Sequence, residues 1–502
     1  MINKNTTFLT FARHLLFAWM VLLLAVSCSK GPSAAQGKSD ASSIEDLAGS
    51  KVAVITGSLQ DLFLEDSGAE LLRLGSVAEI IAATGSGNAD FLASDSASFI
   101  GINAEERGLR FCFSFSMGNS DLGFGFRLTD FQMCSQFNEF LSQLRADGTY
   151  DDIIRRWTKE YTPLTVIPEE LRVPIDGEPI RVGVSVFQPF TYLSDGTWQG
   201  LEMEILQRYA LSVGRPLEVT NYDFAALIPA LVSGRIDIIS SSMTITEERA
   251  KQVLFSDPYY SSNAAIFAHN ASSEDAGTIA GFIASVKKSF VSNIITEQRW
   301  KMLLNGLWET VVISFFSILL GSLCGMLICY MRMSRHRGLS GTAQVIVDIV
   351  RGVPVLVFLM VMFYIVFASS GITARWVAII AFAINFGSYT SEMFRTGIKG
   401  VDRGQTEAGL AMGFTPFATF RLFVVPQALK NIIPVFKGEA VSLIKNTSVV
   451  GYIAIQDLTK VSDIIRSRTF DAFFPLIFIS IIYFILAWLL GKFLDRMAGK
   501  LK

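Results

Sequence analysis

The chain has 502 residues, which is too long for one ordinary globular core and favours two or three folding units. Hydrophobic residues make up 51% of the chain and charged residues only 18%, so part of it is expected to lie in lipid. The formal net charge of −2 offers no basic field for nucleic acid, which is therefore not an expected partner. The five cysteines and three histidines lack metal-ligand spacing, so no metal site is expected.

The first 28 residues predict an export signal. Basic residues precede an apolar run over 15–26, and Ser27 and Cys28 follow it. Residues 24–28 resemble a lipoprotein cleavage box, which implies that Cys28 is lipidated. An uncleaved signal anchor is the alternative. In either case the polar linker over 29–44 and the segment after it lie outside the cytoplasm.

Residues from about 45 to 270 predict a soluble α/β region. Short β-type runs such as KVAVI at 51–55 and IRVGV at 180–184 alternate with helical stretches such as 130–144. No run in this region reaches the roughly 20 apolar residues that a membrane helix needs.

The second half of the chain predicts a multi-pass membrane domain. Five apolar runs are long enough to span a bilayer, and they lie near 306–331, 344–368, 374–394, 432–455 and 472–494. Basic residues cluster after the first span, between the third and fourth, and after the fifth. The positive-inside rule makes that side cytoplasmic and returns the α/β region to the outside.

Several motifs between 178 and 262 follow one another in a recognisable order. They are VGV at 182–184, FQPF at 187–190, GLEME at 200–204, FAALIPAL at 224–231, GRID at 234–237, SSMTITEER at 241–249 and FSDPYY at 255–260. This segment resembles the first lobe of the family 3 solute-binding proteins that serve polar amino acid importers. One departure is Glu204, where the family usually has Asp.

The resemblance implies an amino acid site, and the residue types suit it. A free amino acid carries a carboxylate and an ammonium, so a selective site needs a fork-shaped cation and a buried acid. Arg249 is the candidate for the carboxylate; Ser242 and Thr244, two residues apart, are expected to point the same way and add hydroxyl donors. Phe187 and Phe224 are expected to wall the site, with ordinary core packing as the alternative.

Residues 45–160 resemble the second lobe of the same family. A strand and a Gly turn lead to Ser58, where the N–H groups of a helix start are expected to meet the ligand carboxylate. The stretch GNADFLASD at 87–95 resembles the segment whose last acid binds the ammonium, which gives Asp95 that role. A helix N-cap is the alternative for Asp95.

The lobes occur in the opposite order to that of the family. We interpret residues 45–162 as lobe two plus the returning C-terminal segment, 163–178 as a linker, and 179–270 as lobe one. One circularly permuted domain explains this order, and two truncated copies are the alternative. Cys112 and Cys134 both lie in this exported part, and their spacing leaves open whether they pair.

After a linker over 271–300, residues 301–496 resemble the permease subunit of those same importers. The motifs are RGVP at 351–354, YTSEMFR at 389–395, GQTEAGLAMGF at 404–414, VPQAL at 425–429 and KNTS at 445–448. In the family the third motif forms a short cytoplasmic coupling helix that docks on the ATPase, which assigns this role to Glu407, Ala408 and Gly413. Gly409, where Ala is commoner, is expected to loosen that helix. Glu392 is a candidate for the substrate pathway or for an interfacial position.

The chain has no phosphate loop. The segment AQGKS at 35–39 resembles the end of one, but the first Gly of that motif would stand at position 32, which is Pro32. We therefore expect no cofactor on this chain and ATP hydrolysis by a separate cytoplasmic ABC ATPase. Five spans also call for a second permease chain, as a homodimer or a heterodimer.

The expected function is the permease, with fused binding domain, of an ATP-driven importer of a polar amino acid in the bacterial inner membrane. Ser185 and Val186 lie where binders of basic amino acids have an acid, which favours a neutral polar or acidic ligand. An amino-acid-gated ion channel or a receptor is the alternative, although no Gly-rich filter sequence is present.

Overall fold

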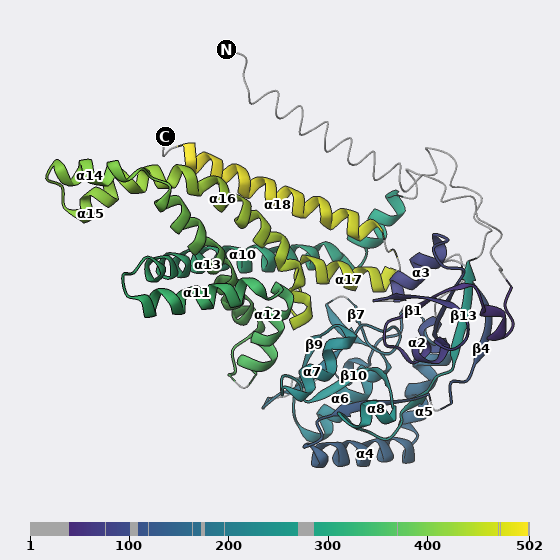
Figure 1. Ribbon diagram of the computed structural model, residues 1–502. Coiled ribbons are helices and arrows are strands. Elements are labelled where there is room, and N and C mark those ends of the chain that lie inside the picture. Colours follow the sequence, from purple (N-terminus) through teal and green to yellow (C-terminus); the bar gives the residue numbers. More distant parts are fainter. Residues whose placement is uncertain are drawn as a thin grey trace. The chain divides into compact units, whose positions relative to one another are not determined.

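The structure is a computed structural model that describes residues 40–499, except 76, 101–108, 119, 163, 172–175, 195, 270–285, 369, 470 and 472 (Figure 1). The predicted signal and Cys28 lie outside the described residues. The described residues form two compact units. The first comprises 40–94, 109–115 and 264–269, and the second comprises 95–100, 116–263 and 286–499.

The first unit is built on one five-stranded sheet, sheet A, in the order β2-β1-β3-β13-β4. β1 pairs in parallel with β2 and β3, whereas β13 pairs antiparallel with β4. Apolar side chains such as Val52, Val54 and Phe91 alternate into a buried core, as the period of a strand requires. The elements are β1 (Lys51–Ile55), α2 (Leu59–Leu64), β2 (Glu70–Leu74), α3 (Val77–Gly85), β3 (Phe91–Asp95), β4 (Leu109–Phe115) and β13 (Ala264–His269).

The α/β part of the second unit, residues 95–100 and 116–263, is called lobe one. Its sheet, sheet B, has the order β11-β5-β10-β6-β9, with β12 also paired to β5. Helices α4 and α6 cover one face and α7 the other (Figure 1). The elements are β5 (Asp121–Phe126), α4 (Phe131–Ala146), α5 (Thr149–Ile154), β6 (Ile180–Val184), β7 (Tyr192–Ser194), β8 (Thr197–Gln199), α6 (Leu201–Val213), β9 (Leu217–Asn221), α7 (Leu227–Val232), β10 (Ile238–Thr244), α8 (Glu247–Ala250), β11 (Leu254–Phe255) and β12 (Tyr260–Ser261).

Each sheet contains strands from both sides of residues 163–178. β5, from the N-terminal side of these residues, pairs antiparallel with β10, from their C-terminal side. β13, from the C-terminal side, completes sheet A instead, so the boundary of lobe one at 270 is wrong for Ala264–His269. The choice between one permuted domain and two truncated copies stays a prediction. Cys112 and Cys134 are both free thiols.

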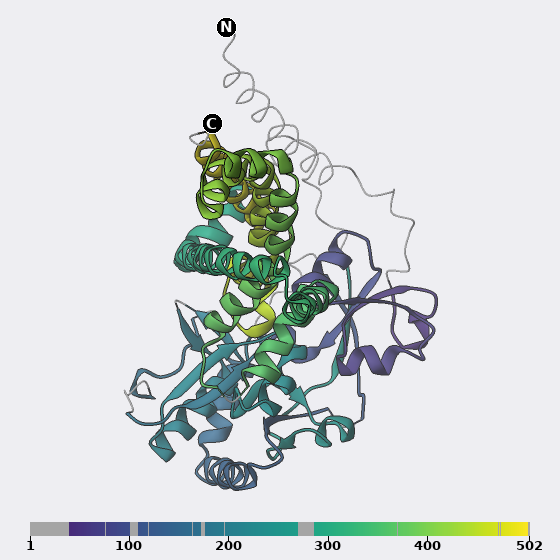
Figure 2. The ribbon, with the colours of Figure 1, turned by 60° about the vertical axis from the view of Figure 1, so that its left-hand side comes forward.

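Residues 286–499 form an all-helical region (Figures 1 and 2). Helix α10 packs closely against α13 because Gly321 and Gly325 face Ala383 and Thr390; a Cβ on Gly325 would lie 2.1 Å from Oγ1 of Thr390. The elements are α10 (Arg299–Arg332), α11 (Arg337–Gly352), α12 (Val355–Val361), η9 (Met362–Val366), α13 (Ala374–Lys399), α14 (Arg403–Ala411), α15 (Pro416–Thr419), η10 (Phe420–Val424), α16 (Val425–Asn446), η11 (Thr447–Ile453), α17 (Leu458–Thr469) and α18 (Phe474–Gly499).

The prediction of five spans differs from the structure. Among the described residues, three helices are long and apolar enough to cross a membrane: Val286–Arg332, Ala374–Lys399 and Phe474–Arg496. The pair Arg337–Gly352 and Val355–Val366 makes a fourth only if it counts as one span, because it bends by 108°. The expected fourth span at 432–455 falls on α16 and η11. Polar residues of α16 such as Glu439 line a cavity there, so its composition is not that of a lipid-facing span.

Candidate functional site

Arg249 lies at the centre of the site predicted in lobe one. It belongs to the short helix α8, whose N-cap Thr246 accepts a hydrogen bond from the Arg249 N–H at 3.2 Å. Its Nη1 donates to the carbonyl of Thr244 at 3.0 Å, and its guanidinium lies over the Phe224 ring, 5.4 Å from the centroid. The structure therefore brings Arg249, Thr244 and Phe224 together, with Thr244 contributing its carbonyl; the predicted ligand contact of its hydroxyl stays a prediction.

Asp95 supplies a carboxylate close to this cation. It ends β3 and occupies the N-cap position of the 3₁₀ turn Ser96–Phe99, where its side chain makes no capping hydrogen bond. Burial lowers the pKa of Arg249, and the carboxylate of Asp95 opposes that effect through space. An acid and a guanidinium in one neighbourhood complement the two charges of a free amino acid.

Ser242 lies at an irregular point of β10 rather than on a regular strand leading to Thr244. A bulge between Ile239 and Met243 breaks the alternation of β10, and Ser242 has a positive φ of 47°. As a result both the N–H and the hydroxyl of Ser242 donate to Oε1 of Glu202, at 2.6 and 3.0 Å. The expectation that Ser242 and Thr244 point the same way is therefore wrong, because the period-2 argument holds only for a regular strand.

Glu202 is a buried carboxylate that sequence analysis did not single out as functional. Its second oxygen, Oε2, accepts from the hydroxyls of Thr191 at 2.9 Å and Ser240 at 2.6 Å, and Tyr259 donates to Oε1. A buried carboxyl group with both oxygens engaged in hydrogen bonds fixes the loop geometry around β10. Its role in this structure is to shape the site rather than to face a ligand.

Phe187 and Ser58 were also predicted as site residues. Phe187 packs on Phe190, with ring centroids 5.7 Å apart, at the edge of the lobe one core, so the core interpretation fits it better. Ser58 belongs to the first unit, where it is the N-cap of α2 and accepts from the N–H of Asp61 at 3.1 Å. Its proposed contact with the ligand stays a prediction.

The predicted coupling helix is α14. Asp402 is its N-cap, Glu407 and Ala408 are exposed, and Gly413 has the positive φ of 85° that turns the chain after it. The expected loosening of α14 by Gly409 stays a prediction, and the structure adds a packing reason for the glycine, since a Cβ there would lie 2.5 Å from Cγ2 of Thr419. Glycine at this position lets the chain around Thr419 pack directly on α14.

Apolar side chains beside α14 are strongly exposed. Met412 is 61% and Phe417 is 72% accessible to solvent. An exposed apolar patch next to exposed polar residues is typical of a surface that docks on another protein.

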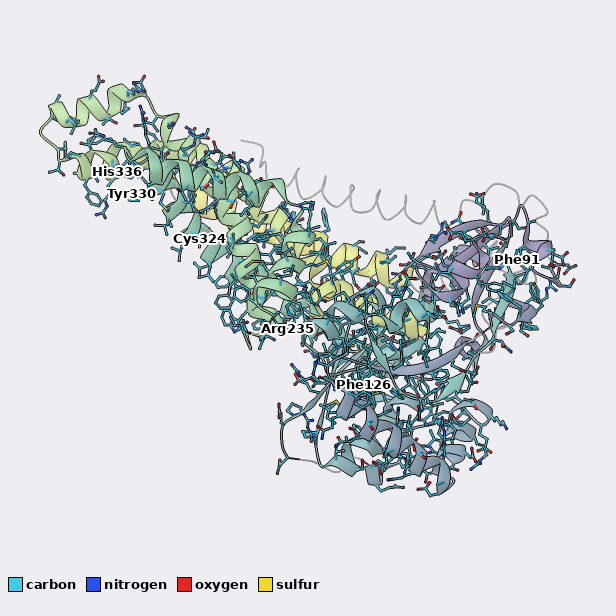
Figure 3. The ribbon with its side chains drawn as sticks, turned by 60° about the horizontal axis from the view of Figure 1, so that its bottom comes forward. Phe91, Phe126, Arg235, Cys324, Tyr330 and His336 are labelled. Atoms are coloured by element: carbon cyan, nitrogen blue, oxygen red, sulfur yellow. The ribbon has the colours of Figure 1, made fainter. Side chains whose placement is uncertain are left out.

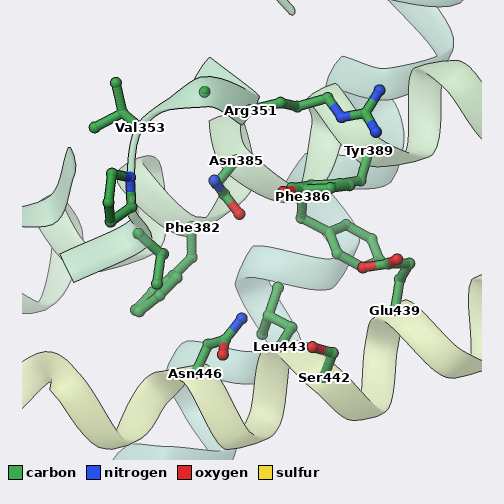
Figure 4. A pocket seen from close by; sticks show the side chains of 13 residues that line it. Arg351, Val353, Phe382, Asn385, Phe386, Tyr389, Glu439, Ser442, Leu443 and Asn446 are labelled. Carbon is green, nitrogen blue, oxygen red and sulfur yellow. The ribbon is translucent and has the colours of Figure 1, made fainter. Parts of the chain in front are cut away.

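A cavity of about 530 Å³ lies in the helical region, between the α11–α12 bend, α13 and α16 (Figure 4). It brings together three of the motifs, through Arg351, Tyr389 and Asn446. Arg351 stacks on the Tyr389 ring, with Cζ 4.8 Å from the centroid. The full lining is Arg351, Gly352, Val353, Pro354, Val355, Phe382, Asn385, Phe386, Tyr389, Glu439, Ser442, Leu443 and Asn446.

The polar groups of this cavity were not predicted as site residues. In the described part of the chain, the side chains of Asn385, Glu439 and Asn446 have no hydrogen-bond or ion-pair partner. A cation, a carboxylate and two amides around one cavity are the groups that hold an amino acid. Glu439 lies outside every motif, so only the pairing of α16 with α13 reveals it.

Glu392 lies outside the cavity lining. It is ion-paired to Arg332, at the end of α10, at 2.6 Å and to Arg395 at 2.5 Å. These pairs fit the interfacial alternative. Among the described residues, no group of three or more acidic, cysteine or histidine side chains is arranged to hold a metal ion.

Comparisons with known proteins give two kinds of match. Residues 180–433 match the family of bacterial extracellular solute-binding proteins, family 3. The L-cystine transport system permease protein of Bacillus subtilis (strain 168) is 32% identical over 41% of this chain and 93% of its own length. The arginine transport system permease protein of the same organism is 30% identical over 39% of this chain and 91% of its own length.

A solved structure also matches the chain. The crystal structure of an amino acid ABC transporter with histidines is 32% identical to it, with a TM-score of 0.38. That match covers 44% of this chain and 98% of the solved one.

Proposed function

Because the chain belongs both to the bacterial extracellular solute-binding proteins, family 3, and to the permeases of amino acid ABC importers, we propose that it receives its amino acid at Arg249 and passes it inward through the cavity at Arg351 and Glu439. The chain is a permease fused to the binding domain of an amino acid importer. Its membership implies an ATPase partner and an amino acid substrate.

The proposed amino acid site is supported by the group of side chains that Arg249, Phe224 and Asp95 form. Arg249 is held by its hydrogen bond to the Thr244 carbonyl and by the Phe224 ring, so its fork is preorganised for a carboxylate. Asp95 lies close enough to influence Arg249 electrostatically and is assigned the ammonium. The ligand closes this arrangement by neutralising each charge with its opposite.

The cavity is proposed as a second binding site, which the amino acid occupies transiently during transport. Arg351 offers a guanidinium to the carboxylate, Glu439 accepts from the ammonium, and Asn385 and Asn446 accept or donate as the side chain requires. Its volume of about 530 Å³ lies within the range typical of small-molecule sites. A binding site in the helical region would receive the substrate from the binding domain on its way to the cytoplasm.

ATP is proposed to act only through the partner subunit, which docks on α14 at Glu407 and Ala408 and on the exposed Met412 and Phe417. This chain is proposed to bind no cofactor. Since the three or four candidate spans among the described residues are few for a complete pathway, we propose a homodimer in the inner membrane, with the binding domain on the outer side.

Uptake by reconstituted vesicles tests this function. The full chain and its ATPase are placed in liposomes with internal ATP, and each of the twenty amino acids and L-cystine is supplied outside in radiolabelled form. Accumulation of at least one of them is expected, and Arg249→Ala should abolish its binding in calorimetry. Vesicles that accumulate none of the panel would refute the proposal.

A further inference from the structure

Lobe one is joined to the helical region by an ion pair at one end of a short segment. Asp223, which directly precedes the 3₁₀ turn η6 (Phe224–Ala226), pairs with Nζ of Lys460 on α17. The Lys460 side chain is only 7% exposed, so the pair is shielded from water on the side of the helical region. Removal of one partner leaves the other charge uncompensated.

The other end of the same segment is held by Arg235, three residues after α7 ends. Its Nη1 donates to the Ile372 carbonyl at 3.0 Å, and its Nη2 donates to the carbonyls of Phe363, at 3.2 Å, and Phe367. Its guanidinium lies over the Phe363 ring, 4.3 Å from the centroid. Arg235 therefore caps the carbonyl end of η9, where a cation is favoured. Figure 3 labels Arg235 where lobe one meets the helical region.

Apolar packing fills the space between these two anchors. Tyr364 and Ala454 of the helical region pack against an apolar cluster of lobe one, which includes Tyr222 and, from α7, Leu227. Elsewhere, Arg468 of α17 lies over the Tyr192 ring of lobe one, 5.2 Å from the centroid. The contact thus combines charge pairing with a buried apolar centre, as specific interfaces do.

The anchored segment is also a wall of the amino acid site. Phe224 follows Asp223 directly in the chain, and its ring carries the guanidinium of Arg249. A ligand carboxylate that draws on Arg249 must alter the stacking on Phe224, and one peptide unit connects that ring to the ion pair with Lys460. The segment from Asp223 to Arg235 therefore touches the ligand site on one side and the permease at both ends.

We propose that the segment Asp223–Arg235, called the bridge segment, reports the occupancy of the amino acid site to the helical region. It does so through the Asp223–Lys460 ion pair and the Arg235 contacts. This inference rests on the proposed function, since it takes Arg249 as the carboxylate ligand. It requires that the two ends of the bridge segment stay attached while the ring of Phe224 responds to the ligand.

A charge exchange across the ion pair tests the bridge segment. The full chain is reconstituted with its ATPase, and ATP hydrolysis is measured with and without a saturating amino acid from the panel above. Asp223→Lys and Lys460→Asp are each expected to reduce the amino acid stimulation by at least about fivefold, while the dissociation constant of the amino acid changes by less than about threefold. The double exchange should recover at least about half of the stimulation, since it restores an opposite-charge pair.

Arg235→Lys provides an independent variant that keeps the charge. Lysine cannot donate to three separated carbonyls from a planar fork, so a loss of stimulation is expected here too. Arg215→Lys is the matched control, because Arg215 donates to the carbonyls of Glu178 and Pro179 within lobe one and should leave stimulation unchanged.

The outcomes distinguish a failure of the proposed function from a failure of the bridge segment alone. If the unaltered chain binds no amino acid of the panel, the proposed function fails and this inference fails with it. If the unaltered chain binds and is stimulated, but Asp223→Lys and Arg235→Lys behave like it, the bridge segment alone is refuted. A double exchange that is no better than the single variants would equally refute the ion pair as its anchor.

Discussion

The guanidinium of Arg249 lies over the ring of Phe224, 5.4 Å from its centroid, while Nη1 donates to the Thr244 carbonyl. The ring fixes the plane of the guanidinium and the carbonyl fixes one edge of it. A guanidinium held in one plane suits a flat, doubly accepting group such as a carboxylate. This relationship, more than the presence of a cation, defines the proposed amino acid site.

Arg249→Lys is therefore expected to weaken amino acid binding even though the charge is kept. An ammonium neither stacks as a plane on Phe224 nor donates in two parallel hydrogen bonds, so the dissociation constant should rise by about 10- to 100-fold. Calorimetry on the full chain in detergent measures it. Lys251→Ala, at the exposed C-cap of the same helix, is the control and should change affinity by less than about twofold. An unchanged affinity in Arg249→Lys would remove the planar fork from the site.

Glu439→Gln is expected to impair transport of the amino acid but not its binding at Arg249. The carboxylate borders the cavity and has no partner among the described residues, so its loss should leave binding at Arg249 intact. Uptake into vesicles should fall by at least about tenfold, because an ammonium loses a charge-assisted partner there. Asp495→Asn, a carboxylate of α18 that pairs with Lys437, is the control. Full uptake by Glu439→Gln would show that this acid does not serve the substrate.

Gly409→Ala tests the packing beneath the coupling helix. The new Cβ would lie 2.5 Å from Cγ2 and 2.9 Å from Oγ1 of Thr419, so α14 must move away. Overpacking of this kind costs about 1–3 kcal/mol, and ATPase binding to the full chain should weaken by at least about fivefold. Adding Thr419→Ala removes both clashing atoms and should restore binding. Gly341→Ala, a site with open space on α11, should have no effect; loss without rescue would contradict the packing argument.

Asp457 predicts a pH dependence of stability. It is buried before α17, accepts from the N–H groups of Thr459 and Lys460 and from the Tyr483 hydroxyl, and burial raises its pKa to about 6. Between pH about 4 and about 6 the folded chain keeps a proton that the unfolded chain has lost. Its contribution to unfolding free energy therefore falls as pH rises through that interval.

Asp457→Asn should flatten this part of the profile. The melting temperature of the helical region, followed in detergent from pH 4 to 7, should decline more steeply with pH in the unaltered chain than in Asp457→Asn. Comparison of the two chains removes the titration of all other carboxylates, which they share. Parallel profiles would mean that Asp457 does not titrate in this range.

Local chemistry was predictable wherever it depended on one regular element or on one unbroken motif. The binding motifs pointed to Arg249, and the acid at the end of the GNADFLASD run pointed to Asp95, which the structure brings near it. The turn at Gly413 followed from the need for a positive φ. The reversed order of the lobes was also predicted from the sequence, and in the structure β5 and β13 each pair with a strand from the other side of residues 163–178.

The sequence failed where a residue's neighbours came from elsewhere in the chain. The bulge in β10 turned Ser242 toward Glu202, and Thr419 explained the glycine at 409. Glu439 belongs to no motif, and it faces a cavity only because α16 packs beside α13.

The sequence by itself determined which segments fold as α/β, which are apolar enough for lipid, and which family motifs they carry, because these follow from periodicity, composition and short-range pattern. Only the tertiary structure decided that Asp223 and Lys460, 237 residues apart, form an ion pair, and that Arg235 caps a helix of the permease. Side chains acquire such partners when segments far apart in the sequence pack together, and no local sequence pattern predicts which segments meet.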